Sequence, residues 1–194
     1  MIQTQTKYIL ITGSGSQIAQ NIAQEISLEK NFSDCHFLLQ YRKNKPNTLI
    51  NCLENKKIKD TLIKADLSEL NNIQILVKAY IQPLGKLDIL INCIGDFVQK
   101  PLNELQSSEF RQIIDSNLNL VFDLYSSVLP FLRKNEGISN ILSLGYATAN
   151  QIEAKPSILP YHIAKMGLIL LTKSFAKEEA EHQVLINCLS LGIC

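Results

Sequence analysis

The stretch "YILITGSGSQIAQ", residues 8–20, decides the fold. Tyr8–Thr12 is a short apolar run that ends at Gly13, which is the pattern of a buried strand. Apolar residues then follow helical spacing at Ile18, Ile22, Ala23 and Ile26. A glycine loop that enters a helix offers free N–H groups and the positive end of the helix dipole to a pyrophosphate. Because the loop has only two glycines, an ordinary strand-to-helix turn without a ligand is the alternative.

Further apolar runs alternate with helical patterns along the whole chain. The predicted strands are Tyr8–Thr12, His36–Gln40, Thr61–Ala65, Asp88–Asn92, Ser139–Leu144 and Val184–Leu189. Helical patterns lie around residues 18–26 and 73–80, along a stripe from Phe110 to Leu132, and over Pro160–Glu181, whereas residues 44–59 are polar and only faintly helical. This order predicts a doubly wound, Rossmann-type α/β fold, a mostly parallel sheet in three α/β/α layers. We expect one domain over residues 1–194.

Composition excludes several classes of protein. The net charge is +1 with 19% charged residues, too little for nucleic acid as the main partner. The five cysteines form no CxxC pair and no His-Cys metal spacing, which favours reduced thiols in the cytoplasm and no metal. The N-terminus lacks a signal-peptide pattern, and no apolar run approaches membrane-spanning length.

Ligands of doubly wound sheets bind at the carboxyl ends of the strands, so the residues there are candidates. After the second strand, Arg42 and Lys43 stand where an NAD site usually has a carboxylate. Two cations suit the 2′-phosphate of NADP, although a solvated charge pair is the plain alternative. Asp66 ends the third strand and is either a ligand contact or a helix cap.

Two helical positions carry unexpected polar groups. Asn117 falls on the apolar stripe, where an unbonded buried amide costs roughly 1–3 kcal/mol. It either ties neighbouring backbones together or relays hydrogen bonds into a site. Tyr161 and Lys165 are four residues apart and share one face of the last helix. An adjacent ammonium favours a phenolate, which makes tyrosine usable as an acid or base, but this spacing also arises by chance.

The ordered set Thr12-Gly13, Asn92-x-x-Gly95, Asn117, Ser143 and Tyr161-x-x-x-Lys165 resembles the short-chain dehydrogenase/reductase family. The resemblance covers essentially the whole chain. Within the family, the chain is similar to 3-oxoacyl-reductase-like or pteridine-reductase-like members. The resemblance implies an NADP(H)-dependent reductase or dehydrogenase for a small carbonyl or alcohol substrate, with NADP(H) preferred over NAD(H). It also implies a homodimer or homotetramer, and the apolar helix around Leu168 to Leu171 agrees with a subunit contact.

The resemblance assigns each catalytic role to one residue. Tyr161 would protonate the carbonyl oxygen, and Lys165 would lower the pKa of Tyr161 and bond the nicotinamide ribose. Ser143 would hold the substrate oxygen, and Asn117 would anchor a water that leads protons to Lys165. The implied cofactor contacts are Gly13, Ser14, Gly15, Gln17, Ile18, Tyr41, Arg42, Asp66, Leu67, Asn92, Cys93, Gly95, Tyr161 and Lys165.

Three departures from the family pattern qualify these expectations. Gln17 replaces a glycine, and we expect its side chain to point away from the phosphates. Ser143 and Tyr161 are 18 residues apart, about five more than is common in the family. The chain stops at Cys194, so we expect that the family's substrate-covering segment and last strand are not present. A catalytically impaired nucleotide-binding or oligomerising relic is therefore the alternative function, and an enoyl-thioester reductase is a further one.

Overall fold

Among residues 6–32 and 34–192, which a computed structural model describes, six parallel strands form one sheet. The strands are β1 (Lys7–Thr12), β2 (Cys35–Tyr41), β3 (Lys59–Lys64), β4 (Ile89–Asn92), β5 (Ser139–Tyr146) and β6 (Val184–Leu191). Their order across the sheet is β3-β2-β1-β4-β5-β6. The direction of winding reverses between β1 and β4, so the carboxyl ends of these two strands flank the switch point of the sheet.

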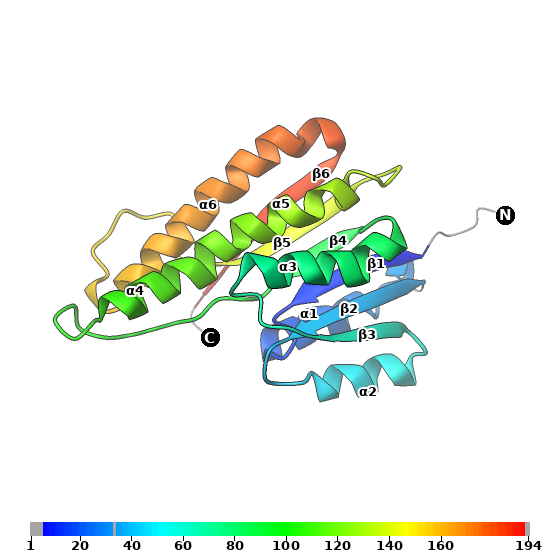
Figure 1. Ribbon diagram of the computed structural model, residues 1–194, viewed down its shortest axis with the longest axis horizontal. Coiled ribbons are helices and arrows are strands. Elements are labelled where there is room, and N and C mark those ends of the chain that lie inside the picture. Colours follow the sequence, from blue (N-terminus) through cyan, green and yellow to red (C-terminus); the bar gives the residue numbers. More distant parts are fainter. Residues whose placement is uncertain (1–5, 33, 193–194) are drawn as a thin grey trace.

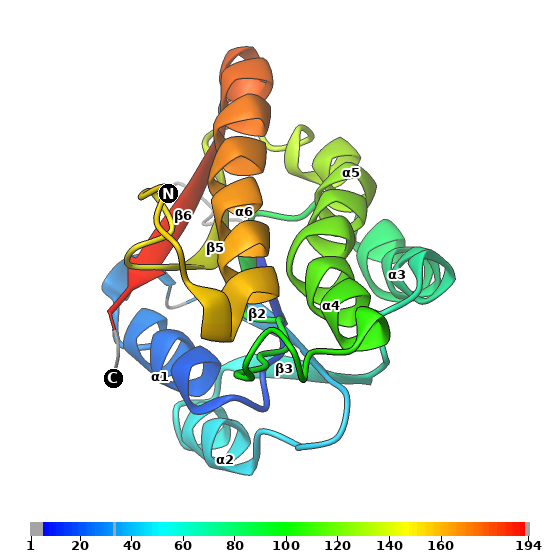
Figure 2. The same cartoon turned by 90° about the vertical axis from the view of Figure 1, so that its left-hand side faces the viewer.

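Helices cover both faces of the sheet (Figures 1 and 2). The longer helices are α1 (Gln17–Ile26), α2 (Asn47–Asn55), α3 (Leu70–Leu76), α4 (Ser107–Ile114), α5 (Leu120–Leu132) and α6 (Leu159–Glu179). Short 3-10 helices span η1 (Lys30–Phe32), η3 (Gln82–Leu84), η5 (Pro156–Ile158) and η6 (Ala180–His182), and π-helical turns span η2 (Val77–Ile81) and η4 (Asp115–Asn119).

Two apolar cores result, one on each face, because successive side chains of a strand point to opposite faces. Leu10 of β1 belongs to the core under α3, α5 and α6. Ile9 and Ile11 of the same strand belong to the core under α1 and α2. The strands are therefore apolar on both faces, which is why their sequences are continuous apolar runs. This confirms the predicted three-layer α/β/α fold.

The sequence boundaries hold to within a few residues, with two differences. Residues 44–59 contain a regular helix, α2, because Leu49, Ile50 and Leu53 are buried against the sheet although their neighbours are polar. The predicted single stripe from Phe110 to Leu132 is two helices, α4 and α5, joined by the π turn η4. Of the helices in the described ranges, none is long and apolar enough to traverse a lipid bilayer.

Candidate active site

A cleft of about 670 Å³ opens at the carboxyl ends of the strands, beside the switch point. We call it the main cleft; it is lined by residues that follow β1, β2, β3 and β4 and by residues of α4, η4 and the start of α5. A second hollow of about 310 Å³, the inner pocket, is lined by Asn117, Tyr146, Tyr161 and Lys165 among others. The two share Ser16, Cys93, Ile94 and Gly95, so they adjoin each other.

The glycine loop after β1 is shaped by close backbone contacts. Gly13 has a φ of 67°, and a Cβ there would lie 2.8 Å from the carbonyl oxygen of Cys93. A Cβ at Gly15 would lie 2.1 Å from the carbonyl oxygen of Asn44. Both glycines are therefore required by the protein's own packing and also line the main cleft. Ser16, which the sequence analysis missed, lines both hollows and caps α1 by accepting a hydrogen bond from the Ala19 N–H at 3.2 Å.

Three side chains that were predicted to contact a cofactor do not reach either hollow. The Gln17 amide donates to Asn21 at 2.8 Å on the exposed side of α1, which agrees with the expected outward orientation. The Ser14 hydroxyl is buried and has no hydrogen-bond partner in the described part of the chain. The Asn92 oxygen accepts from the Thr12 hydroxyl at 2.7 Å, so this amide ties β4 to β1 beneath the site. The side chains of Ser14 and Asn92 face the interior and that of Gln17 faces outward, so any cofactor contact of these residues would have to come from the backbone.

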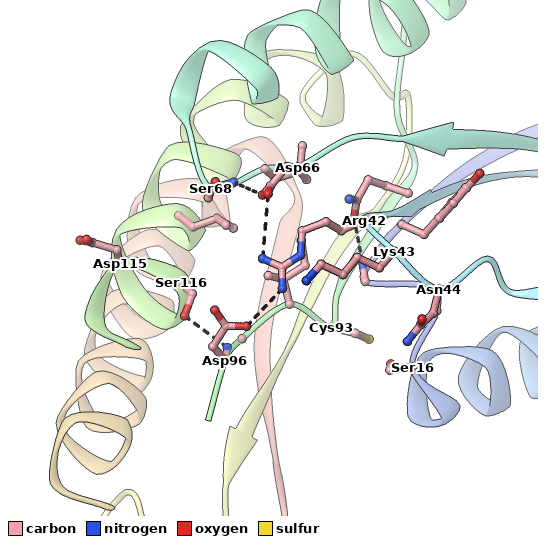
Figure 3. A pocket seen from close by; sticks show the side chains of 18 of the residues that line it. Ser16, Arg42, Lys43, Asn44, Asp66, Ser68, Cys93, Asp96, Asp115 and Ser116 are labelled. Atoms are coloured by element: carbon pink, nitrogen blue, oxygen red, sulfur yellow. Dashed lines mark hydrogen bonds and ion pairs between the residues drawn. The ribbon is translucent and has the colours of Figure 1, made fainter. Parts of the chain in front are cut away.

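Arg42 lies at the centre of the main cleft, where Figure 3 shows its guanidinium between two carboxylates. Its nitrogens lie 4.0 Å from Asp66 and 3.7 Å from Asp96. Lys43 also lines the cleft and has no ion-pair partner among residues 6–32 and 34–192. Tyr41 and Leu67, both predicted contacts, line the same wall. Asp96 was missed by the sequence analysis, although its position just after β4 and Gly95 could have indicated it.

Asn117 occupies the π turn η4 and is fully buried. Its amide nitrogen donates to the carbonyl oxygens of Asp96 at 2.8 Å and Ile113 at 3.0 Å. Its side-chain oxygen lines the interior without a hydrogen-bond partner in the described ranges. Asn117 thus ties the loop after β4 to the helix and also carries an unused acceptor at the inner pocket. Both roles that the sequence left open are compatible with this geometry.

Tyr161 and Lys165 meet in the inner pocket, one turn apart on α6. The Lys165 ammonium donates to the carbonyl oxygen of Leu144 at 2.7 Å and lies 5.4 Å from the centre of the Tyr161 ring. Burial lowers the pKa of Lys165 to about 8, against the opposing influence of Cys188 and Cys93.

Burial raises the pKa of Tyr161, and the neighbouring Tyr146 raises it further. Lys165 is not among the groups that shift the pKa of Tyr161 here, so the expected lowering of that pKa by Lys165 stays a prediction.

Ser143 is not among the residues that line the inner pocket, although its neighbours Leu144 and Gly145 are. Its side chain is fully buried, and its hydroxyl is paired with the Tyr125 hydroxyl at 2.8 Å. It also accepts from the Asn92 amide at 3.4 Å. Ser143 faces α5, whereas the residue of β5 that lines the inner pocket with a hydroxyl is Tyr146. That Ser143 holds a substrate oxygen therefore stays a prediction, which requires its hydroxyl to exchange the bond to Tyr125 for one to the ligand.

Comparison with known proteins gives an independent view of this arrangement. The family model for the short chain dehydrogenase matches residues 7–194. The 3-oxoacyl-[acyl-carrier-protein] reductase of Staphylococcus aureus is 28% identical over 191 residues, covering 96% of this chain and 74% of that protein. The L-fucose dehydrogenase of mouse is 33% identical over 142 residues, covering 72% of this chain and 50% of that protein.

Solved structures share the fold. A 3-oxoacyl-[acyl-carrier protein] reductase from Brucella melitensis superposes with a TM-score of 0.85 at 21% identity, covering 97% of this chain and 76% of the other. An NADH-dependent reductase complexed with NAD superposes with a TM-score of 0.84 at 22% identity, covering 98% of this chain and 80% of the other. In the part of the chain that the structure describes, no group of three or more His, Cys, Asp or Glu residues could hold a metal ion.

Proposed function

The chain belongs to the short-chain dehydrogenase family, and on that premise we propose that it reduces a carbonyl to an alcohol, or catalyses the reverse, with NADP(H). Family membership makes it an oxidoreductase that acts on CH–OH and C=O groups with a nicotinamide cofactor. The observation that carries the finer proposal is the meeting of Tyr161, Lys165 and Asn117 in one pocket that adjoins the main cleft.

The residues of the two hollows fit a dinucleotide. The main cleft begins at the N-terminus of α1, whose free N–H groups and dipole suit a pyrophosphate. The cofactor-binding set that we propose from the predicted residues is Gly13, Gly15, Ile18, Tyr41, Arg42, Asp66, Leu67, Cys93 and Gly95. The unused oxygen of Asn117 adds a polar acceptor at the inner end, which suits a bound water.

Arg42 and Lys43 support NADP(H) over NAD(H). Both cations line the wall of the main cleft that follows β2, and no carboxylate of β2 itself is available to bond a ribose 2′-hydroxyl. The guanidinium nitrogens of Arg42 lie 4.0 Å from Asp66 and 3.7 Å from Asp96. A bound 2′-phosphate would replace these two carboxylates as the partner of Arg42. A charge-assisted contact with a phosphate is stronger and more directional than such loose, half-exposed ion pairs.

In the proposed reaction the bound nicotinamide supplies or accepts the hydride. Tyr161 gives its proton to the carbonyl oxygen during reduction and takes it back during oxidation. Its raised pKa keeps the phenol protonated at neutral pH, which is the form needed for reduction. Lys165 donates a hydrogen bond to the carbonyl oxygen of Leu144 and so keeps β5 beside Tyr161. The free side-chain oxygen of Asn117 binds a water, through which Tyr161 regains its proton.

The substrate class that best matches the relatives is a 3-oxoacyl thioester. A reductase of such compounds in Staphylococcus aureus aligns with 96% of this chain. Phe97 packs edge-on against Tyr161 at 5.0 Å between ring centres and is 58% exposed, so the approach to Tyr161 is apolar on this side. Exposed apolar side chains on α5 and α6, Phe122 and Leu170, support the further proposal of a homodimer or homotetramer.

Replacement of Tyr161 by Phe tests the proposal. Wild-type protein should oxidise NADPH with a ketone or with acetoacetyl-coenzyme A, and Tyr161→Phe should lose about 10²–10⁴-fold in kcat because the proton donor is gone. NADPH binding, followed by fluorescence titration, should stay within a few-fold. The alternative function is a relic that binds nucleotide without catalysis. It predicts instead that wild type binds NADPH but does not oxidise it when a ketone, a 3-oxoacyl thioester or a pteridine is supplied.

A further inference from the structure

Asp96 faces Arg42 across the main cleft, and neither the sequence nor the family resemblance assigns it a role. Arg42 directly follows β2, whereas Asp96 lies in the loop after β4. In the sheet β2 and β4 flank β1, so the ion pair bridges the carboxyl end of β1 from one wall of the cleft to the other. Figure 3 shows the guanidinium of Arg42 reaching this carboxylate, with Asp66 on its other side.

The carboxylate of Asp96 is held more firmly than that of Asp66. One of its oxygens lies 3.7 Å from Arg42, and the other accepts a hydrogen bond from the Gln112 amide at 3.1 Å. The Asp96 side chain is 32% exposed, whereas that of Asp66 is 49% exposed and lies 4.0 Å from Arg42. Asp66 also accepts from the N–H of Ser68 at 3.1 Å. Asp96 is therefore the stronger competitor for Arg42, because the closer and less exposed ion pair is screened less by water and salt.

The backbone of Asp96 is fixed by the helical segment behind it. Its N–H donates to the Ser116 hydroxyl at 3.2 Å, and its carbonyl oxygen accepts from the Asn117 amide at 2.8 Å. These bonds hold Asp96 in place when the guanidinium of Arg42 turns towards a ligand. The carboxylate then keeps its bond to Gln112, so the turn breaks one loose ion pair and leaves Asp96 with a partner.

Carboxylates outnumber cations in the main cleft. Among the residues that the structure describes, Asp66, Asp96 and Asp115 line it together with Arg42 and Lys43. A 2′-phosphate that binds at Arg42 has to take the guanidinium from Asp96, because both are anions that seek the same cation. A 2′-hydroxyl carries no charge and leaves the ion pair in place.

We propose that Asp96 is a specificity-determining residue of the cofactor site, because it competes with a 2′-phosphate for Arg42 and so limits the preference for NADP(H) over NAD(H). This inference rests on the proposed binding of the dinucleotide in the main cleft, with its 2′-phosphate at Arg42. Asp96 keeps Arg42 in the cleft of the free protein, and it lowers the affinity for NADP(H) below the one that an unpaired guanidinium would give.

The test compares the Kd values of NADPH and NADH for wild type and Asp96→Asn, measured by fluorescence titration at low ionic strength. Asparagine keeps the shape of the side chain and an oxygen for Gln112, but it removes the charge. The Kd of NADPH should fall about three- to fivefold, the range expected from the loss of one partly exposed ion pair, and the Kd of NADH should stay within about twofold.

Asp115→Asn is the matched control. Asp115 lines the same cleft, with the Asn119 amide rather than Arg42 as its partner, at 2.7 Å. Its replacement should change both Kd values by less than about twofold, since it removes a nearby negative charge without releasing the guanidinium.

Arg42→Ala identifies the cause of the change. In this background Asp96→Asn should have no larger effect on the Kd of NADPH than Asp115→Asn has, because the cation for which the two anions compete is gone. A larger effect that persists in Arg42→Ala would overturn the inference. An equal change for both cofactors, or an unchanged Kd of NADPH in Asp96→Asn, which would place the phosphate elsewhere, for example at Lys43, would overturn it as well.

These outcomes concern binding and are separate from turnover. If wild type binds NADPH but does not reduce acetoacetyl-coenzyme A with it, the proposed reaction fails, and the change in the two Kd values still decides the role of Asp96. If wild type binds neither NADPH nor NADH, the proposed function and this inference are both overturned.

Discussion

Lys165 and Arg42 are the two cations on which the proposed chemistry of the site depends, and they differ in their exposure to solvent. Lys165 is 5% exposed and rests on a backbone carbonyl at the inner pocket. Arg42 lies in the open cleft, with half-exposed carboxylates on either side. Burial therefore controls the charge of Lys165, whereas competition between acids and a ligand controls Arg42.

We expect Lys165 to make the stability of the protein pH-dependent. Its folded-state pKa of about 8 lies below the ordinary value of 10.5, so burial opposes protonation and its cost is fully present below pH 8. Between pH 8 and 10.5 the unfolded chain binds more protons, and the free energy of unfolding rises with pH. Relative to Lys165→Met, wild type should gain up to about 3 kcal/mol over this window. Urea unfolding of both proteins at pH 7.5 and 10 measures the difference in their free energies of unfolding. If that difference is the same at both pH values, the burial of a charged Lys165 is contradicted.

Replacement of Arg42 by Ala should weaken NADPH binding selectively. Loss of a charge-assisted phosphate contact corresponds to an increase in the Kd of NADPH of about tenfold or more, with a much smaller change for NADH. Lys78→Ala removes an exposed cation that does not line the cleft and is the matched control. Equal effects of Arg42→Ala on both cofactors would count against the NADP(H) preference.

The π turn η4 shows how one side chain shapes an element. Asn117 donates to the carbonyl oxygen of Ile113, four residues before it, and so competes with the backbone for that acceptor. A π turn accommodates this within an otherwise continuous pair of helices, and such turns are frequent at functional sites. The apolar spacing from Phe110 to Leu132 predicts the helices correctly, but spacing alone does not reveal a turn that depends on a side-chain hydrogen bond.

Gly95 is coupled to this turn, which makes Gly95→Ala informative. A Cβ at this position would lie 2.3 Å from the Asn117 side-chain oxygen, so Asn117 has to move and its bonds to Asp96 and Ile113 are strained. We expect a loss of about 1–3 kcal/mol in the free energy of unfolding together with a loss of turnover. Gly137→Ala, where an added Cβ meets nothing within 4 Å, should be nearly neutral. Equal unfolding free energies for the two variants would contradict the coupling.

Strand β5 shows why the sequence alone does not place the side chain of Ser143. The strand is predicted to end at Leu144 but continues to Tyr146, because it pairs with β6 as far as Leu191. In a sheet covered on both faces, apolar residues on both sides hide the period-two alternation that would tell which face a serine occupies. The position of Tyr161 and Lys165 was easier to predict, since helical spacing fixes their shared face without knowledge of the neighbours.

At the scale of the whole molecule, the sheet gathers residues that are far apart in the sequence. The loops after β1, β2, β3 and β4 all open into the main cleft, and the ends of β5 and β6 reach the inner pocket. The alternation of strands and helices was enough to predict this layout, because parallel strands bring their carboxyl ends to one edge. The individual contacts there, such as Arg42 with Asp96, depend on loop geometry that no periodic pattern encodes.

The most direct test of carbonyl reduction at Tyr161 follows the transferred hydrogen itself. NADPH that carries deuterium at the hydride-donating carbon is mixed with acetoacetyl-coenzyme A and a stoichiometric amount of the protein, and the product is analysed by mass spectrometry. Wild type should yield 3-hydroxybutyryl-coenzyme A with one deuterium, and Tyr161→Phe should yield almost none in the same time while binding the cofactor normally. Equal deuterium transfer by both proteins, or bound NADPH that yields no deuterated alcohol from wild type, would contradict the proposed reaction.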